Sequence, residues 1–377
     1  MTKQIAELDG LRGWMALWVW WAHVSSLAVL PIDNEHGPGW MIANGEFAVG
    51  VFVILSGFVI SMTLDDAGAQ AKRVFYLRRA FRLFPAYLIC LVISAFVLLD
   101  PSITTLETLP WPSPHTAGRL TYLNDSRDAF WTHLALHVPL FHGIIPQSLL
   151  RSTSYAFMGQ AWSLTLEWQY YLIAPFVFAC MSWFEWTPLR QAALLLVLGL
   201  LARRFTQSSM LPSNLYMFTI GYFSFKLYQR RDVRRLSNLS FLTHIAIWGL
   251  AALLVNDRWI SLLIWAPVLY GICRQSPPLP VLCVKQFLSL RPSTRLGAIS
   301  YSFYCSHMIA VFGCAYVLLV LLEIRDKLIY STALVITSLV VTLLLSTLLH
   351  EFVEKPCIAV GRRWGRALET RELEVSA

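Results

Sequence analysis

Long apolar segments separated by short polar stretches run along almost the whole chain. One bilayer crossing takes about 20 apolar residues, and by that measure the pattern predicts ten membrane-spanning helices. They are expected near residues 9–30, 47–64, 82–100, 161–183, 188–205, 212–228, 240–256, 258–274, 296–322 and 328–351. The pattern therefore predicts an all-α, polytopic integral membrane protein.

The longest connection between these spans covers residues 101–160, and it is longer than a link between two helices needs. Prolines and the Asn124-Asp125-Ser126 segment favour turns within it, and a short helix is expected from Ala129 to Phe141. Such a connection is expected to cover or shape a site. The spans and this loop form one membrane domain, residues 1–356. Residues 357–377 form a cytoplasmic tail, expected to be a short interfacial helix followed by disorder.

Clusters of Lys and Arg predict the orientation of the chain, because cytoplasmic loops carry an excess of positive residues. In a ten-span chain these clusters fall on one side, which places both termini in the cytoplasm. Arg203 and Arg204 fall on the opposite side and argue against this count. The clusters comprise Lys72, Arg73, Arg78, Arg79 and Arg82; Lys226, Arg230, Arg231, Arg234 and Arg235; Arg274, Lys285, Arg291 and Arg295; and Arg362, Arg363 and Arg366.

Composition supports the membrane class. Hydrophobic residues make up 56% of the 377 and charged residues 14%, whereas soluble domains have about 25% charged residues. A net charge of +8 would suggest nucleic acid as a partner of a soluble chain. Here the basic residues lie between apolar spans, so we interpret them as orientation signals and expect a lipid bilayer, not a nucleic acid, as the partner.

Neither cysteines nor histidines indicate a metal site. The seven cysteines are scattered and show no C-x-x-C spacing, which predicts neither a disulfide framework nor a zinc site. His133 and His137 are four residues apart with His142 nearby, but no carboxylate or Cys stands at ligand spacing. A surface facing a glycan, with Trp131 and Phe141 close by, is the favoured interpretation of this segment.

Two ionisable residues in the first span are the main candidates for chemistry. Arg12 and His23 are 11 positions apart, close to three helical turns, so both project from one face at a separation of roughly 16 Å. Arg12 suits an anionic ligand entering from the cytoplasm, and His23 can take a proton from a hydroxyl. The structural alternatives are a headgroup anchor for Arg12 and a packing role for His23. Asp9 is expected to cap or salt-bridge the start of this span.

Six segments, in their order along residues 8 to 356, resemble the acyltransferase-3 family of integral membrane acyltransferases. They are LDGLRGWMALWVWWAHV (8–24), GVFVILSGFVIS (50–61), FYLRRAFRLFPAYL (75–88), WSLTLEWQYYLIAP (162–175), LGAISYSFYCSHMIAVF (296–312) and HEFVEKP (350–356). The resemblance implies a ten-helix enzyme of the bacterial cytoplasmic (inner) membrane. It would move an acyl group, usually acetyl, from cytoplasmic acyl-CoA to a sugar hydroxyl of a glycan such as lipopolysaccharide O-antigen or exopolysaccharide.

The resemblance also implies roles for single residues. Arg12 and His23 match the R-x10-H pair of the family. The expected catalytic residues are His23, Arg12 and Glu167. The residues expected to bind the acyl-CoA donor are Arg12, Arg78, Arg79 and Arg82, and those expected to bind the acyl acceptor are Tyr301, His307 and Trp162. No metal is expected. The chain departs from the family at Trp168, where a second Glu is common, and at Met308-Ile309, where Trp-Pro is common.

The expected mechanism places the phosphates of acetyl-CoA, the co-substrate, on the cytoplasmic arginines, because several negative charges need several donors. His23 would then act as general base on a hydroxyl of a glycan or lipid-linked glycan. Direct attack on the thioester and a transient acyl-enzyme both remain open.

Two other functional classes compete with the enzyme. The first is a secondary transporter or flippase for a glycan or lipid-linked glycan, in which the buried Arg, His and Glu would form a proton relay. Paired half-helix segments typical of inverted-repeat carriers are not evident in the sequence. The second is a structural or receptor protein, which would leave the aligned Arg and His without a purpose.

Overall fold

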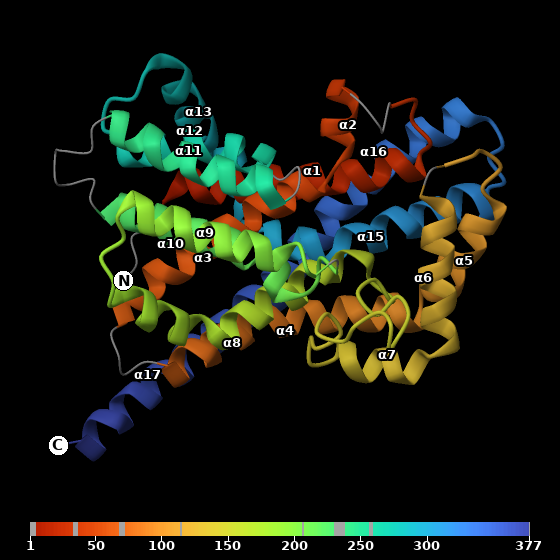
Figure 1. Ribbon diagram of the computed structural model, residues 1–377. Helices are drawn as coiled ribbons and strands as arrows, with labels where there is room; N and C mark the ends of the chain where they lie inside the picture. The colour runs from red at the N-terminus through yellow and green to blue at the C-terminus, as the bar shows by residue number, and fades with distance from the viewer. Residues whose placement is uncertain are drawn as a thin grey trace. The chain divides into compact units, whose positions relative to one another are not determined.

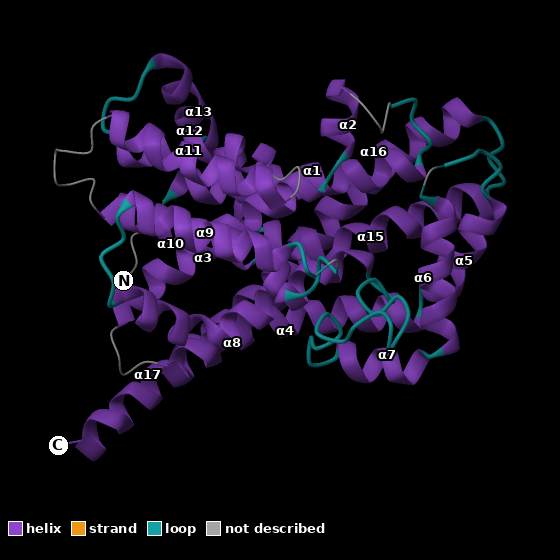
Figure 2. Ribbon diagram, in the orientation of Figure 1, coloured by secondary structure: helices purple, strands orange, loops and turns teal. Residues whose placement is uncertain are grey.

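The computed structural model describes residues 5–32, 37–67, 72–113, 115–205, 207–229, 238–255 and 259–376. Over these residues the chain is helical and contains no strand (Figure 2). It divides into two compact units. The first comprises Met1–Met15, Glu46–Gln70 and Gln169–Ala298, and the second Ala16–Gly45, Ala71–Trp168 and Ile299–Ala377. Helices α1 (Ala6–Leu27) and α8 (Trp162–Ser182) each contribute to both units.

The first unit is built around the pairing of α3 with α10 (Figure 1). A Cβ atom added to Gly57 of α3 would lie 2.3 Å from the Phe218 carbonyl oxygen, and one added to Gly221 of α10 would lie 2.2 Å from that of Ile54. Only glycine permits this approach, as in many membrane helix pairs. The helices of this unit are α3 (Glu46–Ala67), α9 (Pro188–Ala202), the 3-10 turn η2 (Leu211–Ser213), α10 (Leu215–Gln229), α11 (Asn238–Val255), α12 (Trp259–Cys273), α13 (Leu279–Ser289) and α14 (Arg291–Ala298).

The second unit is organised around α15, which packs against α16, α4 and α5, while α17 packs along α4. Two short π-helical segments interrupt its long helices: η4 follows α15, and η5 joins α16 to α17. The elements are α2 (Gly37–Ala43), α4 (Lys72–Phe96), α5 (Leu99–Thr108), α6 (Thr116–Asp128), α7 (Phe130–His137), the 3-10 turn η1 (Gly159–Ala161), α15 (Ser300–Tyr316), η4 (Val317–Leu321), α16 (Lys327–Leu349), η5 (His350–Glu354) and α17 (Lys355–Ser376).

Every expected span coincides with a helix. Among the described residues, four segments are long and apolar enough to cross a bilayer: Glu46–Asp66, Lys72–Phe96, Ser300–Leu321 and Lys327–Thr370. They support the predicted membrane class. The count of ten spans and the cytoplasmic position of both termini stay predictions, and the arginines at 230–235 lie outside the described residues.

The long connection and the tail are more helical than expected. Helix α7 lies within the predicted Ala129–Phe141 helix, but α5 and α6 were not expected in this proline-containing stretch. Pro101 occupies the first turn of α5, where its missing N–H costs nothing because the first amides of a helix have no intrahelical acceptor. The expected disorder at the end of the tail is wrong, since α17 continues to Ser376 while its Trp364 packs edge-on against Phe81 of α4.

Candidate active site

The second unit brings His23 and His307 together. His23 lies on the part of α1 that belongs to this unit, and His307 lies on α15. Their ring centroids are 5.3 Å apart with an interplanar angle of 31°. His307 is fully buried, whereas His23 is partly exposed. Because two imidazoles from distant parts of the chain meet here and one keeps some exposed surface, this pair is the centre of the candidate site.

The hydrogen bonding of His307 fixes its tautomer. Its Nδ1 lies 2.7 Å from the backbone carbonyl oxygen of Tyr304, and a carbonyl can only accept, so Nδ1 carries the proton and donates it. The Nε2 atom therefore keeps its lone pair. This Nε2 is buried and has no hydrogen-bond partner among the described residues. The Nε2 atom is therefore a hydrogen-bond acceptor with a fixed orientation and no donor among the described residues.

A small hydrogen-bond network ties α15 to the start of α8. The Tyr304 hydroxyl lies 2.6 Å from Ser163 Oγ and 3.1 Å from the Gln160 carbonyl oxygen. Gln160 Nε2 donates in turn to the Cys305 carbonyl oxygen at 3.1 Å. Trp162, which is predicted to bind the acyl acceptor, is the first residue of α8 and is largely buried. The network therefore sets the position of the helical turn that carries His307.

The other predicted residues of this region occupy different positions around α15. The hydroxyl of Tyr301 donates to the backbone carbonyl of Leu83 on α4, so it links two helices. Glu167 interacts electrostatically with Tyr301. Trp168, which stands where the family often has a second Glu, packs edge-on against Phe84 with ring centroids 5.0 Å apart. An aromatic contact thus replaces the second carboxylate.

A loop and the start of α6 lie against the end of α1 that carries His23. Ser113 Oγ donates to the Ser26 carbonyl oxygen at 2.9 Å, and Trp111 stacks on Tyr330 of α16 with centroids 5.2 Å apart. Arg119, on α6, is close enough to His23 for their charges to interact, to a lesser extent than those of His23 and His307, and burial lowers the pKa of Arg119 to about 10. Sequence reasoning missed Arg119, because a charged residue in a long connection is usually solvent-exposed.

Arg12 lies in the first unit, where it forms a salt bridge to Asp9 with an N–O distance of 3.2 Å. Of the two roles open to Asp9 at the start of this span, a cap or a salt bridge, the structure shows the salt bridge. Both side chains are about one fifth exposed. Helix α1 is unbroken from Ala6 to Leu27, so the 11-residue spacing of Arg12 and His23 is realised on one continuous helix.

The predicted donor-binding arginines lie on α4, in the second unit. Arg78 forms a salt bridge of 3.0 Å with Glu369 of α17. The guanidinium of Arg79 lies over the Phe75 ring, 5.5 Å from its centroid. Arg82 is partly exposed one turn later. This end of α4 therefore carries a basic surface that is already in contact with α17.

Three of the four histidines of the long connection pack inside the protein. His133, His137 and His142 are all buried, so the interpretation that they face a glycan is wrong, although Trp131 and Phe141 are exposed. The ring of His137 stacks on that of His142 with centroids 3.8 Å apart and an angle of 5°. Parallel rings do not direct their nitrogens at one point, and no group of three metal ligands occurs among the described residues.

Comparison with known proteins identifies relatives of this chain. The acyltransferase-3 family model, described as an acyltransferase domain, matches residues 5–351. Acyltransferase MdmB of Streptomyces mycarofaciens is 25% identical over 174 residues, which cover 46% of this chain and 38% of the relative. O-acetyltransferase OatA of Staphylococcus aureus is 24% identical over 181 residues, covering 46% of this chain and 25% of the relative. No solved structure matches the chain significantly.

Proposed function

Because the chain belongs to the acyltransferase-3 family, we propose that it is a membrane O-acyltransferase that moves an acetyl group from cytoplasmic acetyl-CoA to a sugar hydroxyl. The acceptor is a glycan or lipid-linked glycan, such as lipopolysaccharide O-antigen or exopolysaccharide, at the bacterial cytoplasmic membrane. The relative OatA is an O-acetyltransferase, which supports acetyl as the transferred group. The observation that carries the proposal is the pairing of His23 with His307.

His23 is the general base in this mechanism. It is the more exposed member of the pair, so an acceptor hydroxyl can reach it, and imidazole is a suitable base near neutral pH. As His23 takes the proton, the hydroxyl oxygen attacks the thioester carbonyl carbon. The C–S bond then breaks, and the proton passes from His23 to the departing CoA thiolate. Transient transfer of the acyl group to His23 before it reaches the acceptor is the second form of this mechanism.

His307 positions His23 and stabilises the positive charge that His23 gains when it takes a proton. The Nδ1 proton of His307 is donated to the Tyr304 carbonyl, so its buried Nε2 atom keeps a lone pair. A buried imidazolium on His23 needs a hydrogen-bond acceptor, and this lone pair supplies one. On the donor side, Arg12 grips acetyl-CoA near the thioester, while Arg79 and Arg82 contact its phosphates. Glu167 completes the proposed catalytic set, and Trp162 and Tyr301 shape the acceptor side.

The proposal is tested with purified protein in lipid nanodiscs. Labelled acetyl-CoA and an extracted lipid-linked glycan are supplied, and ester-linked acetyl on the glycan is counted. His23→Ala should lower kcat about 10²–10⁴-fold, the usual contribution of a general base.

His244→Ala is the control for removing an imidazole from an apolar helix, because His244 lies on α11, outside the proposed site. Equal rates for wild type and His23→Ala would refute the proposed role of His23. A wild type that carries glycan across the bilayer without consuming acetyl-CoA would identify a flippase or transporter instead.

A further inference from the structure

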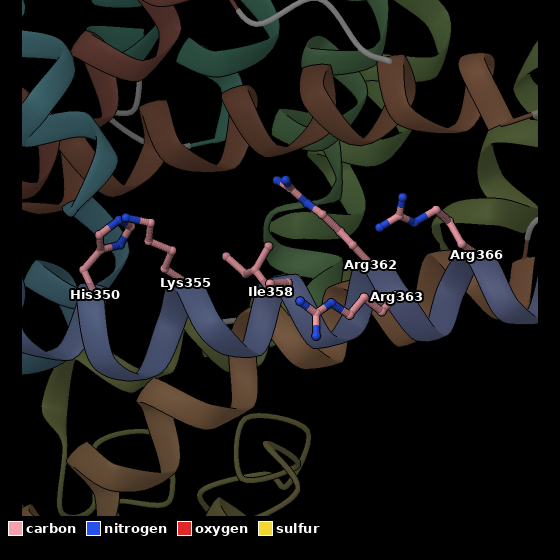
Figure 3. A pocket seen from close by; sticks show the side chains of 7 residues that line it. His350, Lys355, Ile358, Arg362, Arg363 and Arg366 are labelled. Atoms are coloured by element: carbon pink, nitrogen blue, oxygen red, sulfur yellow. The ribbon is translucent and has the colours of Figure 1, made fainter.

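A basic groove of about 500 Å³ follows one face of α17 and the π-helical turn before it. Figure 3 shows the labelled side chains along this helix, with Arg362 and Arg366 extending from the same side. Two apolar residues, Ile358 and Ala359, lie between the charged ones. The lining residues are His350, Lys355, Ile358, Ala359, Arg362, Arg363 and Arg366.

The cations of this groove recur at helical spacing. Counted from Lys355, the arginines follow at seven, eight and eleven residues, which places all four on one face. Lys355 pairs with Glu351 at 2.8 Å. Among the described residues, no carboxylate pairs with Arg362, Arg363 or Arg366. Like charges four residues apart on a helix repel each other, so an anion bound to this face would stabilise it.

Helix α17 is held firmly enough to present a defined site. Cβ atoms added to Gly361 and Gly365 would lie 2.7 Å and 2.9 Å from side-chain atoms of α4, so the two helices are in close contact. The Arg78–Glu369 salt bridge lies on the same contact. Arg78 of α4 is thereby held against α17.

The start of α17 is fixed by a buried carboxylate. Glu354 is 4% exposed and accepts hydrogen bonds from Ser302 Oγ at 2.7 Å and from His350 Nδ1 at 3.0 Å. These contacts anchor the π-helical turn between α16 and α17 on α15. Such π-helical turns occur frequently at functional sites, and this one forms the end of the groove.

We propose that the groove of α17 binds phosphate, specifically the phosphate groups of the acyl-CoA donor. Guanidinium groups match phosphate oxygens in a two-point fork, and three of them serve several negative charges at once. The volume lies in the range of small-molecule sites. Six of the seven lining residues, including every cation except His350, lie beyond residue 351, where the family match ends.

The choice of donor rests on the proposed function, whereas the phosphate chemistry rests on the groove alone. Two sources can supply such phosphate: the nucleotide end of CoA and the headgroup of an anionic lipid. CoA is favoured because α17, which carries the groove, packs along α4, the helix that carries the predicted donor-binding residues Arg79 and Arg82. A small apolar patch, Ile358 and Ala359, gives the adenine ring a surface to lie on.

The test compares two double variants of the full chain with identical loss of charge. Arg362→Gln/Arg366→Gln removes two groove cations, and Arg291→Gln/Arg295→Gln removes two exposed arginines at the same spacing on α14. Binding of CoA and of 3′,5′-ADP is measured by calorimetry in nanodiscs of neutral phosphatidylcholine. Monodispersity and far-UV dichroism show that each variant is folded.

The groove variant should weaken CoA binding roughly tenfold or more for each guanidinium removed, with a reduced dependence on salt. The control should bind as wild type does. Unchanged CoA binding by the groove variant overturns the donor assignment.

A second experiment replaces part of the phosphatidylcholine in the nanodiscs with phosphatidylglycerol and measures the binding of this anionic lipid to the protein. If wild type binds that lipid but not CoA, and the groove variant no longer binds the lipid, the groove binds headgroups and the donor assignment is wrong. If wild type binds neither, the phosphate site itself is refuted. These assays measure binding and involve no turnover. A failure of acetyl transfer in the activity assay would therefore refute the proposed function without deciding whether the groove binds phosphate.

Discussion

His307 illustrates how the backbone prepares a side chain for chemistry. Its Nδ1 proton bonds the carbonyl of Tyr304, one turn earlier on the same helix, and this leaves Nε2 as a defined acceptor. The sequence placed His23 on α1 from its spacing to Arg12, and it marked His307 from a family resemblance. It gave no physical reason for their pairing, because that contact joins residues 284 positions apart and depends on how α1 packs against α15.

The Tyr304 hydroxyl supports this arrangement, so Tyr304→Phe tests it. The substitution removes the contacts to Ser163 and Gln160 while keeping the ring. We expect a decrease of about 1 kcal/mol in the free energy of unfolding and a smaller fall in activity than His23→Ala causes. Thermal unfolding and the acetyl-transfer rate are the measurements. Complete loss of transfer without loss of stability would instead indicate that this hydroxyl carries the acyl group.

Among the helices, the pairing of α3 with α10 depends on two glycines. The Ser56-Gly57 segment of α3 combines two small residues, which favour close packing of membrane helices, and the structure shows that packing at Gly57. The apolar pattern predicted the helices themselves, because each span needs about 20 apolar residues. It did not predict α5 and α6, where turn-forming residues argued for loop and where tertiary packing, including that of α5 on α15, decides the structure.

Gly221→Ala is expected to destabilise the protein. Its Cβ would lie 2.2 Å from the Ile54 carbonyl oxygen, and overpacking of this kind costs about 1–3 kcal/mol. Gly313→Ala is the control, since nothing lies within 4 Å of its added Cβ and alanine favours helix by up to about 1 kcal/mol. Thermal unfolding in detergent measures both. Equal melting temperatures would show that α3 and α10 tolerate a side chain at their crossing.

The stacked histidines of α7 and its following loop predict a pH-dependent stability. Burial lowers the pKa of His137 to about 3, and burial together with the neighbouring His137 lowers the pKa of His142 well below its ordinary value. The unfolded chain therefore binds more protons than the folded chain between about pH 3 and 6.5. The stability is present above about pH 6.5 and is lost as the pH falls, by up to about 1.4 kcal/mol per histidine per pH unit.

Hydrogen exchange of residues 130–160 between about pH 7 and 5 measures this effect, with intrinsic exchange rates corrected for pH. His133 contributes in the same direction, because burial lowers its pKa and Asp125 opposes that shift only in part. His142→Phe keeps a ring on His137 but cannot take a proton, so its protection should depend less on pH. A variant with the full wild-type dependence would contradict the assignment.

Over the whole chain, composition and hydropathy were enough to identify a membrane protein, and ordered motifs were enough to indicate its family. The chemistry required the structure: Arg119 acts on His23 from a connection that the sequence treated as covering, and the basic face of α17 lies in a tail expected to be partly disordered. In both cases the tertiary packing determines how buried the charged side chains are and which groups surround them. A hydropathy pattern carries no information about that packing.

The most direct test of the histidine pair compares wild type, His307→Gln and His244→Gln in cells, at equal membrane abundance. Ester-linked acetyl on the extracted surface glycans is measured by mass spectrometry. Gln keeps a polar side chain at both buried positions but removes the imidazole. We expect acetyl to fall at least about tenfold in His307→Gln and to stay at the wild-type level in His244→Gln. Full acetylation by His307→Gln would contradict a joint role of His23 and His307.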